Sequence, residues 1–496
     1  MGSKSIIIIG AGIAGLATGC YAQMNGYRTH VFELHDKPGG LCTAWKRKVY
    51  TIDGCIHHLA GSSPNSGLYG VWQELGAVQA GEVLFHEELV RVEGPGGRAF
   101  VVYTDIDRLE QHMKELAPAD ARVIEEYTGA ARLFTHLDMF SFVILKPWEI
   151  ASKMLPRAGA FIKWGKITLE RFATRFNDPF LRQAFPVIQY DFPDIPMLVH
   201  LNFLACCHNR TLGWPMGGSL AFSRAIEERY RELGGEIDYR ARVTKILVEN
   251  DCAVGVRLAD GTQHHSDIVI SAADGHSTVF DMLEGRYANE RIRAYYAAAP
   301  DHCKMSLHVS LGVARDMSRE PHALTYFLKR PIIIMNQTVD RLNIEIFNFD
   351  PSQAPNGKSV VKALFDSSYA YWKDLSADRA RYEDEKRRIA EVVIDRLDER
   401  FPGLAKQVEV VDVATPLTFE RYTGNWQGLQ AWLPPGGGFS LSMKGFSKTL
   451  PGLKNFHMVG QWAEAMIGVS TAAVSGRKMI QMLCKRDKKR FVTTRP

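Results

Sequence analysis

The sequence lacks the patterns that mark several large classes of protein. None of its eight cysteines forms a C-x-x-C pair, so the spacing typical of zinc ligands and of short disulfide frameworks is absent. No window approaches the ~18 uninterrupted apolar residues of a membrane-spanning helix. Lys and Arg number 60 against 55 for Asp and Glu, a balance too even to indicate a nucleic-acid partner. We therefore expect no metal site, no nucleic acid and a reducing, cytoplasmic location.

The composition is that of a globular protein with more than one folded unit. The 496 residues are about three times the ~150 that commonly make one domain. A content of 46% hydrophobic and 23% charged residues is ordinary for a soluble protein with a large core. The apolar stretch at residues 6–22 resembles the core of a signal peptide, but the glycines at positions 10, 12 and 15 interrupt it and a strand-like run continues to Glu33. We therefore expect this stretch to be part of the fold.

The N-terminal segment predicts a βαβ unit with a glycine-rich first turn. The expected elements are a β-branched strand at 5–9, a helix over about 13–25 and a second strand at 29–33. Between the first strand and the helix, Gly10 permits a tight turn, Gly12 lets backbone N–H groups approach a pyrophosphate, and Gly15 allows close contact of helix and strand. The phosphates would lie at the helix N-terminus, at Ile13 and Ala14, where unpaired N–H groups and the helix dipole favour negative charge.

Residues after the second strand define the nucleotide further. Glu33 stands where a carboxylate can accept both hydroxyls of the adenosine ribose, and it would repel the 2′-phosphate of NADP. Leu34 follows it, and a second glycine pair comes soon after in Pro-Gly-Gly-Leu, at Gly39, Gly40 and Leu41. These residues are predicted to bind the same cofactor.

A distant C-terminal segment favours FAD over NAD. Gly460 and Gln461 follow a predicted strand, and Gly468, Val469 and Ser470 open a predicted helix. An NAD enzyme does not need a distant C-terminal segment at its cofactor. FAD does, because its flavin end has to be bound as well as its adenosine end. A second helix N-terminus near the flavin would also stabilise its anionic reduced form.

The nucleotide-type elements come in three pieces that two insertions separate. We therefore predict an α/β protein with a doubly wound, Rossmann-like FAD domain and an inserted α+β substrate domain that carries possible membrane-facing helices. The FAD domain is expected to comprise 1–78, 206–284 and 408–496, and the substrate domain 79–205 and 285–407. The insertions contain a predicted hairpin at 90–103, a helical, aromatic-rich part at 105–205, strands near 306–311 and a charged helix at 376–398.

In its motifs and their order the chain resembles the phytoene dehydrogenase and carotenoid desaturase-type flavoproteins, within the wider group that shares the FAD-binding fold of amine oxidases. The similarity covers nearly the whole length. The motifs that carry it are Gly10–Leu16, Glu33, Pro38–Gly40, Tyr50–Asp53, Trp214–Gly218, Ala241–Ile246, Ser271–Asp274, Phe349–Pro351, Ala414–Pro416 and Gly460–Gly476.

The resemblance implies non-covalent FAD, with backbone contacts from Val243 to the adenine and the flavin ring held by Gly40, Leu41 and the C-terminal helix start. It also implies an apolar tunnel and a polyene substrate. Three departures stand out: Leu41 replaces an Arg common in relatives, Cys55 replaces a Gly, and Gln461 stands where amine oxidases place an acid.

The function expected from these features is hydride transfer between the flavin and an extended, apolar, unsaturated substrate, most simply a carotenoid-like polyene. The alternatives are a double-bond isomerase or reductase (saturase) of a retinoid or fatty-acyl chain, an amine oxidase, and a non-catalytic, membrane-associated flavin-binding subunit. No second dinucleotide turn is evident, so electrons would pass to or from the substrate, a quinone, oxygen or a redox partner.

Catalytic residues are less defined than the cofactor site. No nucleophile–base motif occurs, and such a motif is not needed where positioning and flavin electronics lower the barrier. His57 and His58 follow Asp53 and are candidates for proton handling, with a structural role as the alternative. The stretch 145–176 alternates aromatic and basic residues, which is typical either of peripheral membrane association or of a buried aromatic cap.

Overall fold

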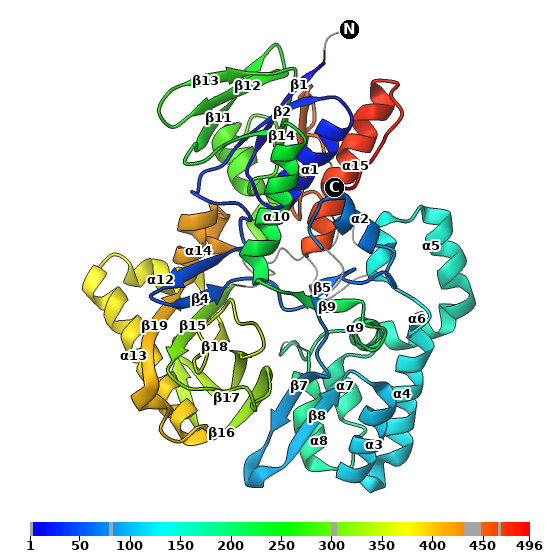
Figure 1. The fold of residues 1–496 in the computed structure, drawn as a ribbon, viewed down its shortest axis with the longest axis vertical. Coiled ribbons are helices and arrows are strands. Elements are labelled where there is room, and N and C mark those ends of the chain that lie inside the picture. Colours follow the sequence, from blue (N-terminus) through cyan, green and yellow to red (C-terminus); the bar gives the residue numbers. More distant parts are fainter. Residues whose placement is uncertain (1–2, 79–82, 190, 299–304, 431–447, 465–467) are drawn as a thin grey trace.

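The fold is known from a computed structural model. It describes residues 3–78, 83–189, 191–298, 305–430, 448–464 and 468–496. In Figure 1 an upper half carries both ends of the chain, and a lower half contains a large sheet on one side and a group of helices on the other.

The upper half is built on a five-stranded parallel sheet, which confirms the predicted α/β class. Its strand order is β10-β2-β1-β14-β20, and every neighbouring pair is parallel. The strands are β1 (Ser5–Ile9), β2 (Arg28–Phe32), β10 (Glu236–Asp238), β14 (Ile268–Ser271) and β20 (Phe456–Met458). Residues 6–9 of β1 are buried on both faces, because each face of the sheet is covered.

Three helices cover one face of this sheet: α1 (Ile13–Met24), α10 (Gly218–Glu232) and α15 (Val469–Arg486). Glycines set how closely they approach. A Cβ atom on Gly476 of α15 would lie 2.6 Å from the hydroxyl of Thr18 in α1, and one on Gly19 would lie 2.5 Å from the ring of Tyr230 in α10. The opposite face contacts an antiparallel sheet of β11 (Val243–Glu249), β12 (Cys252–Leu258) and β13 (Gln263–His265).

The lower half contains a seven-stranded mixed sheet of order β19-β15-β18-β17-β16-β7-β8. Its strands are β7 (Glu88–Glu93), β8 (Ala99–Tyr103), β15 (Ser306–Val313), β16 (Ala323–Ile334), β17 (Gln337–Phe347), β18 (Ser359–Asp366) and β19 (Val408–Ala414). The predicted hairpin at 90–103 is present as β7–β8, and it joins strands of the second insertion through a parallel pairing with β16. The domain ranges stay a prediction, and the pairing of β19 with β15 favours a boundary after residue 414.

Helices line the sheet and fill the rest of the lower half. On the sheet lie α12 (Tyr369–Leu375), α13 (Arg379–Arg400) and α14 (Pro416–Thr423). The helical region of the first insertion comprises α3 (Ile106–Leu116), α4 (Ala121–Phe134), α5 (Pro147–Met154), α6 (Ala158–Gly165), α7 (Leu169–Ala173), α8 (Pro179–Ala184) and α9 (Met197–His208). The remaining elements are α2 (Tyr69–Glu74), α11 (Glu290–Ala298), β3 (Ala44–Arg47), β4 (Tyr50–Asp53), β5 (Leu59–Ala60), β6 (Val83–Leu84) and β9 (Leu212–Pro215).

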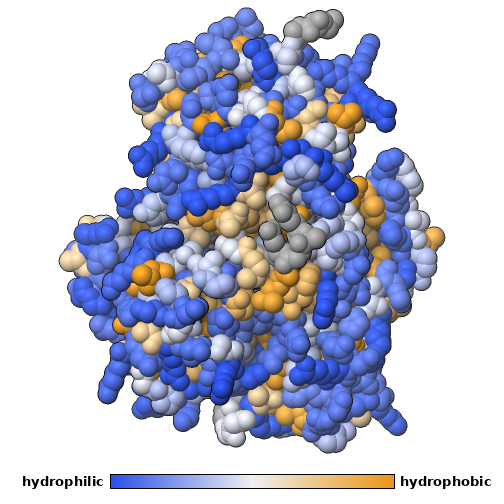
Figure 2. All heavy atoms as spheres, in the orientation of Figure 1, coloured by the Kyte–Doolittle hydropathy of each residue, from blue (hydrophilic) through white to orange (hydrophobic). Residues whose placement is uncertain are grey.

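The aromatic, basic stretch at 145–176 divides into a buried and an exposed part. Phe161, Trp164, Phe172 and Phe176 are core residues of α6, α7 and the turn that follows. Three other apolar side chains face solvent: Trp148 (64% exposed), Leu155 (79%) and Ile162 (60%). Figure 2 shows hydrophobic surface at the edge of the molecule where α5 and α6 lie. In the part of the chain that the structure describes, no helix combines the length and apolarity needed to cross a membrane.

Candidate functional site

A cavity of about 450 Å³, here called the glycine cavity, lies at the carboxyl ends of β1, β2 and β14. This is the edge where doubly wound sheets bind ligands. The structure brings nearly all of the predicted cofactor residues to it, and Gly15 and Ser470 are the two that do not line it. Those that do are Gly10, Gly12, Ile13, Ala14, Glu33, Leu34, Gly39, Gly40, Leu41, Val243, Gly460, Gln461, Gly468 and Val469.

The glycines of the first turn have different local roles. Gly10 has φ +96°, a conformation that favours glycine. A Cβ atom on Gly15 would lie 2.0 Å from the Gly10 carbonyl oxygen, so this residue serves the contact between helix and turn. A Cβ atom on Gly12 would instead meet only the Gly39 carbonyl oxygen, at 3.8 Å. Gly12 therefore borders open space in the cavity, as a residue that lets a ligand approach the backbone should.

The N-termini of two helices meet at this cavity. Gly12 caps α1 and Gly468 caps α15, and neither cap has a side-chain hydrogen bond to the first turn of its helix. Gly460, with φ +96°, lies against α1, because its Cβ atom would be 3.3 Å from that of Ala14. Ile467, which belongs to the predicted C-terminal motif, lies outside the described residues. Two helix dipoles therefore favour an anionic ligand here.

The Glu33 carboxylate is fixed at the end of β2. One oxygen accepts the Ala11 N–H at 2.6 Å and the other accepts the His35 N–H at 2.8 Å. Burial raises the pKa of Glu33, and these backbone hydrogen bonds oppose the rise. Because each carboxylate oxygen can accept a second hydrogen bond, Glu33 keeps acceptors for a pair of ribose hydroxyls.

Asp274 is a polar residue of the cavity that the site prediction omitted. It follows β14, its pKa is raised to about 7 by burial, and its Oδ2 atom has no hydrogen-bond partner among the described residues. The sequence signal was its place just after the carboxyl end of a buried strand, where ligand-binding residues of such sheets gather.

A second cavity of about 470 Å³, here called the histidine cavity, lies in the lower half between the seven-stranded sheet and the helical region. It contains His57 and His58 in its wall together with His86 and His322. The two cavities share a wall. Cys55 lines the glycine cavity and Ile56 and His57 line the histidine cavity, so the chain passes from one to the other within these residues.

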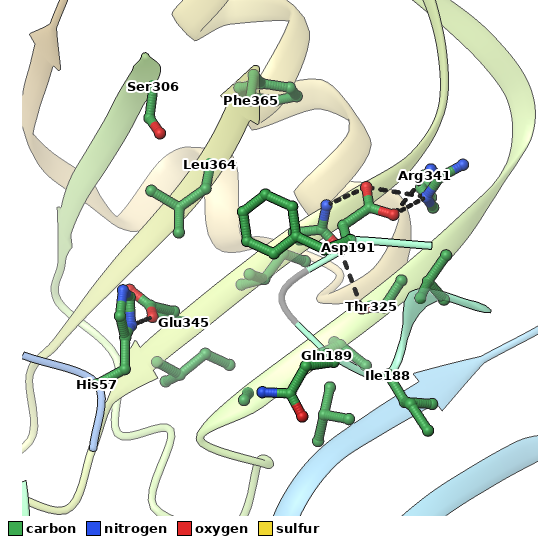
Figure 3. A pocket seen from close by; sticks show the side chains of 18 of the residues that line it. His57, Ile188, Gln189, Asp191, Ser306, Thr325, Arg341, Glu345, Leu364 and Phe365 are labelled. Atoms are coloured by element: carbon green, nitrogen blue, oxygen red, sulfur yellow. Dashed lines mark hydrogen bonds and ion pairs between the residues drawn. The ribbon is translucent and has the colours of Figure 1, made fainter. Parts of the chain in front are cut away.

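Three charged side chains meet in the wall of the histidine cavity. Glu345 on β17 and Lys362 on β18 are paired in the sheet register, and Lys362 Nζ lies 2.6 Å from Glu345 Oε2. His57 Nδ1 forms an ion pair with the other oxygen of the same carboxylate, as Figure 3 shows. Burial would raise the pKa of Glu345, but the adjacent His57 and Lys362 outweigh it and hold that pKa far below its usual range. Glu345 is therefore ionised, and Lys362, which is 2% exposed, neutralises it.

The other histidines of this cavity are neutral rings at pH 7. Burial and the neighbouring His86 and His57 lower the pKa of His58 to about 3, and burial lowers that of His86 to about 4. The rings of His86 and His322 are stacked with their centres 3.6 Å apart, and the ring of His58 lies edge-on to His86. His58 thus contributes shape to the wall, while His57 is the histidine joined to charged partners.

The comparisons with known proteins agree with this geometry. The family model for an NAD(P)-binding Rossmann-like domain matches residues 8–75. A chloroplastic prolycopene isomerase of Daucus carota is 26% identical over 95% of this chain and 78% of that protein. A lycopene-forming phytoene desaturase of Paracoccus sp. is 25% identical over 97% of both. An all-trans-retinol 13,14-reductase of Danio rerio is 22% identical over 92% of this chain and 82% of that protein.

Solved structures show the same fold. An oxidoreductase from Methanosarcina mazei has a TM-score of 0.60 at 18% identity, with 96% of this chain and all of that chain covered. Putrescine oxidase bound to putrescine has a TM-score of 0.57 at 14% identity, with 98% of this chain and 99% of that chain covered.

The fold and the glycine cavity thus define an α/β protein with a parallel, Rossmann-like sheet and the architecture of the amine oxidases. Within that class the chain is a phytoene desaturase- and prolycopene isomerase-like FAD-dependent oxidoreductase, at about 25% identity over nearly its full length. The family comprises flavoenzymes that modify carotenoids and other polyenes. The resemblance predicted from the motifs is confirmed.

Proposed function

We propose that the chain binds one FAD in the glycine cavity and transfers hydride between it and a carbon of an extended, apolar, unsaturated chain in the histidine cavity. The observation that carries this proposal is the shared wall of the two cavities at Cys55–His57. A further contact joins them, because Gln430 of the first cavity donates a hydrogen bond to the Ser306 carbonyl of the second at 3.4 Å.

The residues present fit a flavin dinucleotide. The open space beside Gly12 and Gly40 suits a pyrophosphate, Glu33 suits the adenosine ribose, and the N-terminus of α15 at Gly468 suits the flavin end. When bound, FAD supplies a two-electron acceptor or donor. The carboxylate of Glu33, just after β2, would repel the 2′-phosphate of NADP and so argues against NADP in this site.

The walls of the histidine cavity can position an apolar chain. Ile188, Leu324, Phe347 and Leu364 line it together with Trp214. Hydride transfer requires mainly that the protein hold a carbon–hydrogen bond of the substrate in one orientation beside the glycine cavity. Figure 2 also shows hydrophobic surface in the middle of this face, between the two halves of the molecule.

A second candidate function, isomerisation or reduction of a double bond, is favoured by the charged group around Glu345. Reducing a carbon–carbon double bond requires a proton as well as a hydride. His57, whose ring is held by Glu345 at the shared wall, is able to hold or release a proton there. Lys362 keeps the carboxylate ionised, so the partner of His57 stays an acceptor.

Anaerobic flavin spectroscopy tests the proposed function. The purified protein is expected to contain one FAD per chain, and the visible absorbance of its flavin should change on mixing with an unsaturated polyene. The oxidised flavin is bleached by a substrate for desaturation, and the chemically reduced flavin regains its colour with a substrate for reduction.

Primary amines matched in chain length are the controls for this experiment. Rapid bleaching by an amine, with no response to any polyene or unsaturated lipid, would show that the chain is an amine oxidase. Bound flavin that responds to neither would favour the non-catalytic alternative.

We also propose that the exposed apolar residues near α5 rest on a membrane surface. Trp148, Leu155 and Ile162 project beside basic residues of the same region, and the C-terminal run at 485–490 is strongly basic. The protein should float with anionic liposomes at low salt and less so at high salt. A variant with all three residues changed to serine should stay in the soluble fraction, and because these side chains are exposed it should remain folded. Equal absence of the wild-type protein from neutral and anionic vesicles would contradict the proposal.

A further inference from the structure

A buried hydrogen-bonded chain runs from the helical region into the histidine cavity. The Tyr127 hydroxyl of α4 lies 2.7 Å from Nε2 of His200 in α9, and Nδ1 of His200 lies 2.9 Å from Oε1 of Gln189. All three side chains are buried, and Gln189, 3% exposed, lines the cavity. In Figure 3 the amide nitrogen of Gln189 lies on the side that faces the His57–Glu345 pair.

The direction of these hydrogen bonds follows from satisfying every buried donor. His200 is neutral, because burial lowers its pKa to about 3, so it has one N–H group. If Nδ1 carries the hydrogen, it donates to Gln189 Oε1, and the Tyr127 hydroxyl donates to Nε2. In the reverse direction the Tyr127 hydroxyl hydrogen would have no acceptor among the described residues. The first arrangement satisfies the whole chain and leaves the NH₂ group of Gln189 for the cavity.

The amide nitrogen of Gln189 is the donor that a ligand can use. No described residue accepts a hydrogen bond from it. The neighbouring polar groups are already paired with one another. Arg341 donates to both oxygens of Asp191 at 2.9–3.2 Å, Asn343 donates to Asp191 at 2.9 Å, and Thr325 donates to Asn343 at 3.0 Å.

The charges of the cavity wall indicate which oxygen would bind there. Glu345 is balanced by Lys362, and Asp191 is balanced by Arg341. No cation of these pairs is left to neutralise a carboxylate on a ligand, and burying an unpaired charge is costly. A neutral acceptor, by contrast, satisfies the Gln189 amide without such a cost.

On this geometry we infer that the substrate is not a pure hydrocarbon: it carries a neutral carbonyl or hydroxyl oxygen, which accepts a hydrogen bond from the Gln189 side chain. The inference rests on the proposed function, since it names the end group of the unsaturated chain that the histidine cavity would bind. Tyr127 and His200 are positioning residues that hold the amide in this orientation.

A matched series of polyenes tests the inference by binding. The probes are all-trans C20 polyenes that differ only in one end group: methyl, hydroxymethyl, aldehyde or carboxylate. Their affinities for the flavin-loaded protein are measured by quenching of tryptophan fluorescence, because Trp214 lines the cavity. The hydroxymethyl and aldehyde probes should bind about tenfold tighter than the methyl and carboxylate probes, the size expected for one neutral hydrogen bond.

Two variants separate the role of the donor from a structural role. Gln189→Leu should remove the preference for the oxygenated probes. Gln189→Glu, measured at pH 8, keeps an acceptor for His200 but presents only an acceptor to the ligand. It should lose the preference for the aldehyde and retain part of that for the hydroxymethyl probe, which can donate its own hydrogen.

The outcomes distinguish this inference from the proposed function. Equal binding of the methyl and oxygenated probes to the wild-type protein, with the flavin still responding to polyenes, would overturn the inference alone. A preference that survives in both variants would also overturn it. Failure of every probe to bind, or the absence of any flavin response, would overturn the proposed function as well. The comparison in the wild-type protein needs no variant, so misfolding of a variant would not prevent the test.

Discussion

A protein carrying Gly12→Val should be isolated folded and nearly colourless, with its flavin content below about a tenth of the wild-type value. Gly12 has φ −67° and ψ 171°, an extended conformation that valine adopts readily. Its Cβ atom would make only an ordinary contact, at 3.8 Å, with the Gly39 carbonyl oxygen. The added methyl groups therefore occupy the space where a pyrophosphate would approach the N-terminus of α1, and they leave the core undisturbed.

The measurement is the ratio of flavin absorbance to protein absorbance after purification, with circular dichroism and the melting temperature as checks of folding. Gly129→Ala is the matched control. This residue lies inside α4, and its Cβ atom would have no neighbour within 4 Å. The control should keep its flavin and gain about 0.5–1 kcal/mol of stability, because alanine favours a helix over glycine. A folded Gly12→Val protein with full flavin content would disprove the assignment of the glycine cavity.

Acidification should destabilise the protein strongly between pH 6.5 and pH 5, because several buried histidines are neutral in the native state. Burial lowers the pKa of His200 and His308 to about 3, and that of His457 to about 4. Each of these values lies below the ~6.5 of an unfolded histidine, so in this pH range the unfolded chain binds more protons than the native one. Stability therefore falls as the pH falls, by up to about 1.4 kcal/mol per pH unit for each such residue.

Three buried carboxyl groups oppose this loss of stability on acidification, but they do not turn it into a gain. Burial raises the pKa of Asp274 to about 7 and also raises those of Glu33 and Asp53, so these groups take up protons in the native state and gain stability on acidification. The histidines that burial keeps neutral also include His58, His86 and His322. Together they outnumber the three carboxyls, and we expect a net loss of several kcal/mol, a large part of the 5–15 kcal/mol that is typical of a native protein.

The variant His457→Leu measures how much a single buried histidine contributes to this pH dependence of stability. Both ring nitrogens of His457 lack a hydrogen-bond partner among the described residues, so the substitution removes a titrating group and breaks no hydrogen bond. When the pH is lowered from 7.5 to 5.0, the free energy of unfolding of the variant should rise by about 2 kcal/mol relative to that of the wild-type protein. Urea unfolding at the two pH values provides the free energies. The same difference between variant and wild type at both pH values would show that His457 does not titrate as proposed.

Local sequence patterns were sufficient for the elements that do not depend on distant partners. The buried run of β1, the glycine turn, α1 and β2 lie within the first 32 residues, and each has its own signature in the chain. The hairpin of β7 and β8 was equally readable from its Gly-Pro-Gly-Gly turn. The predicted cofactor residues came together because the carboxyl ends of parallel strands meet at one edge.

Residues 236–248 show where local patterns were insufficient. Residues of types that favour strands, such as Ile237, Tyr239 and Val243, occur throughout this range, but they do not show that it forms two strands, β10 in the parallel sheet and β11 in the antiparallel one. The aromatic stretch at 145–176 is similar, since Trp148 and Trp164 are equally hydrophobic, but one is exposed and the other is buried. Which side of a helix faces the core depends on what lies against it, and that is not encoded within the helix itself.

The sequence alone determined the α/β class, the dinucleotide turn and the family, because these reside in short motifs and in their order. Only the tertiary structure placed Lys362 against Glu345 and brought both to His57, more than 280 residues earlier in the chain. It alone also linked Tyr127, His200 and Gln189 and so gave the Gln189 amide its direction. Such groups depend on strand register and helix contacts between distant segments, and a buried polar atom acquires its chemical role from the partners that folding brings to it.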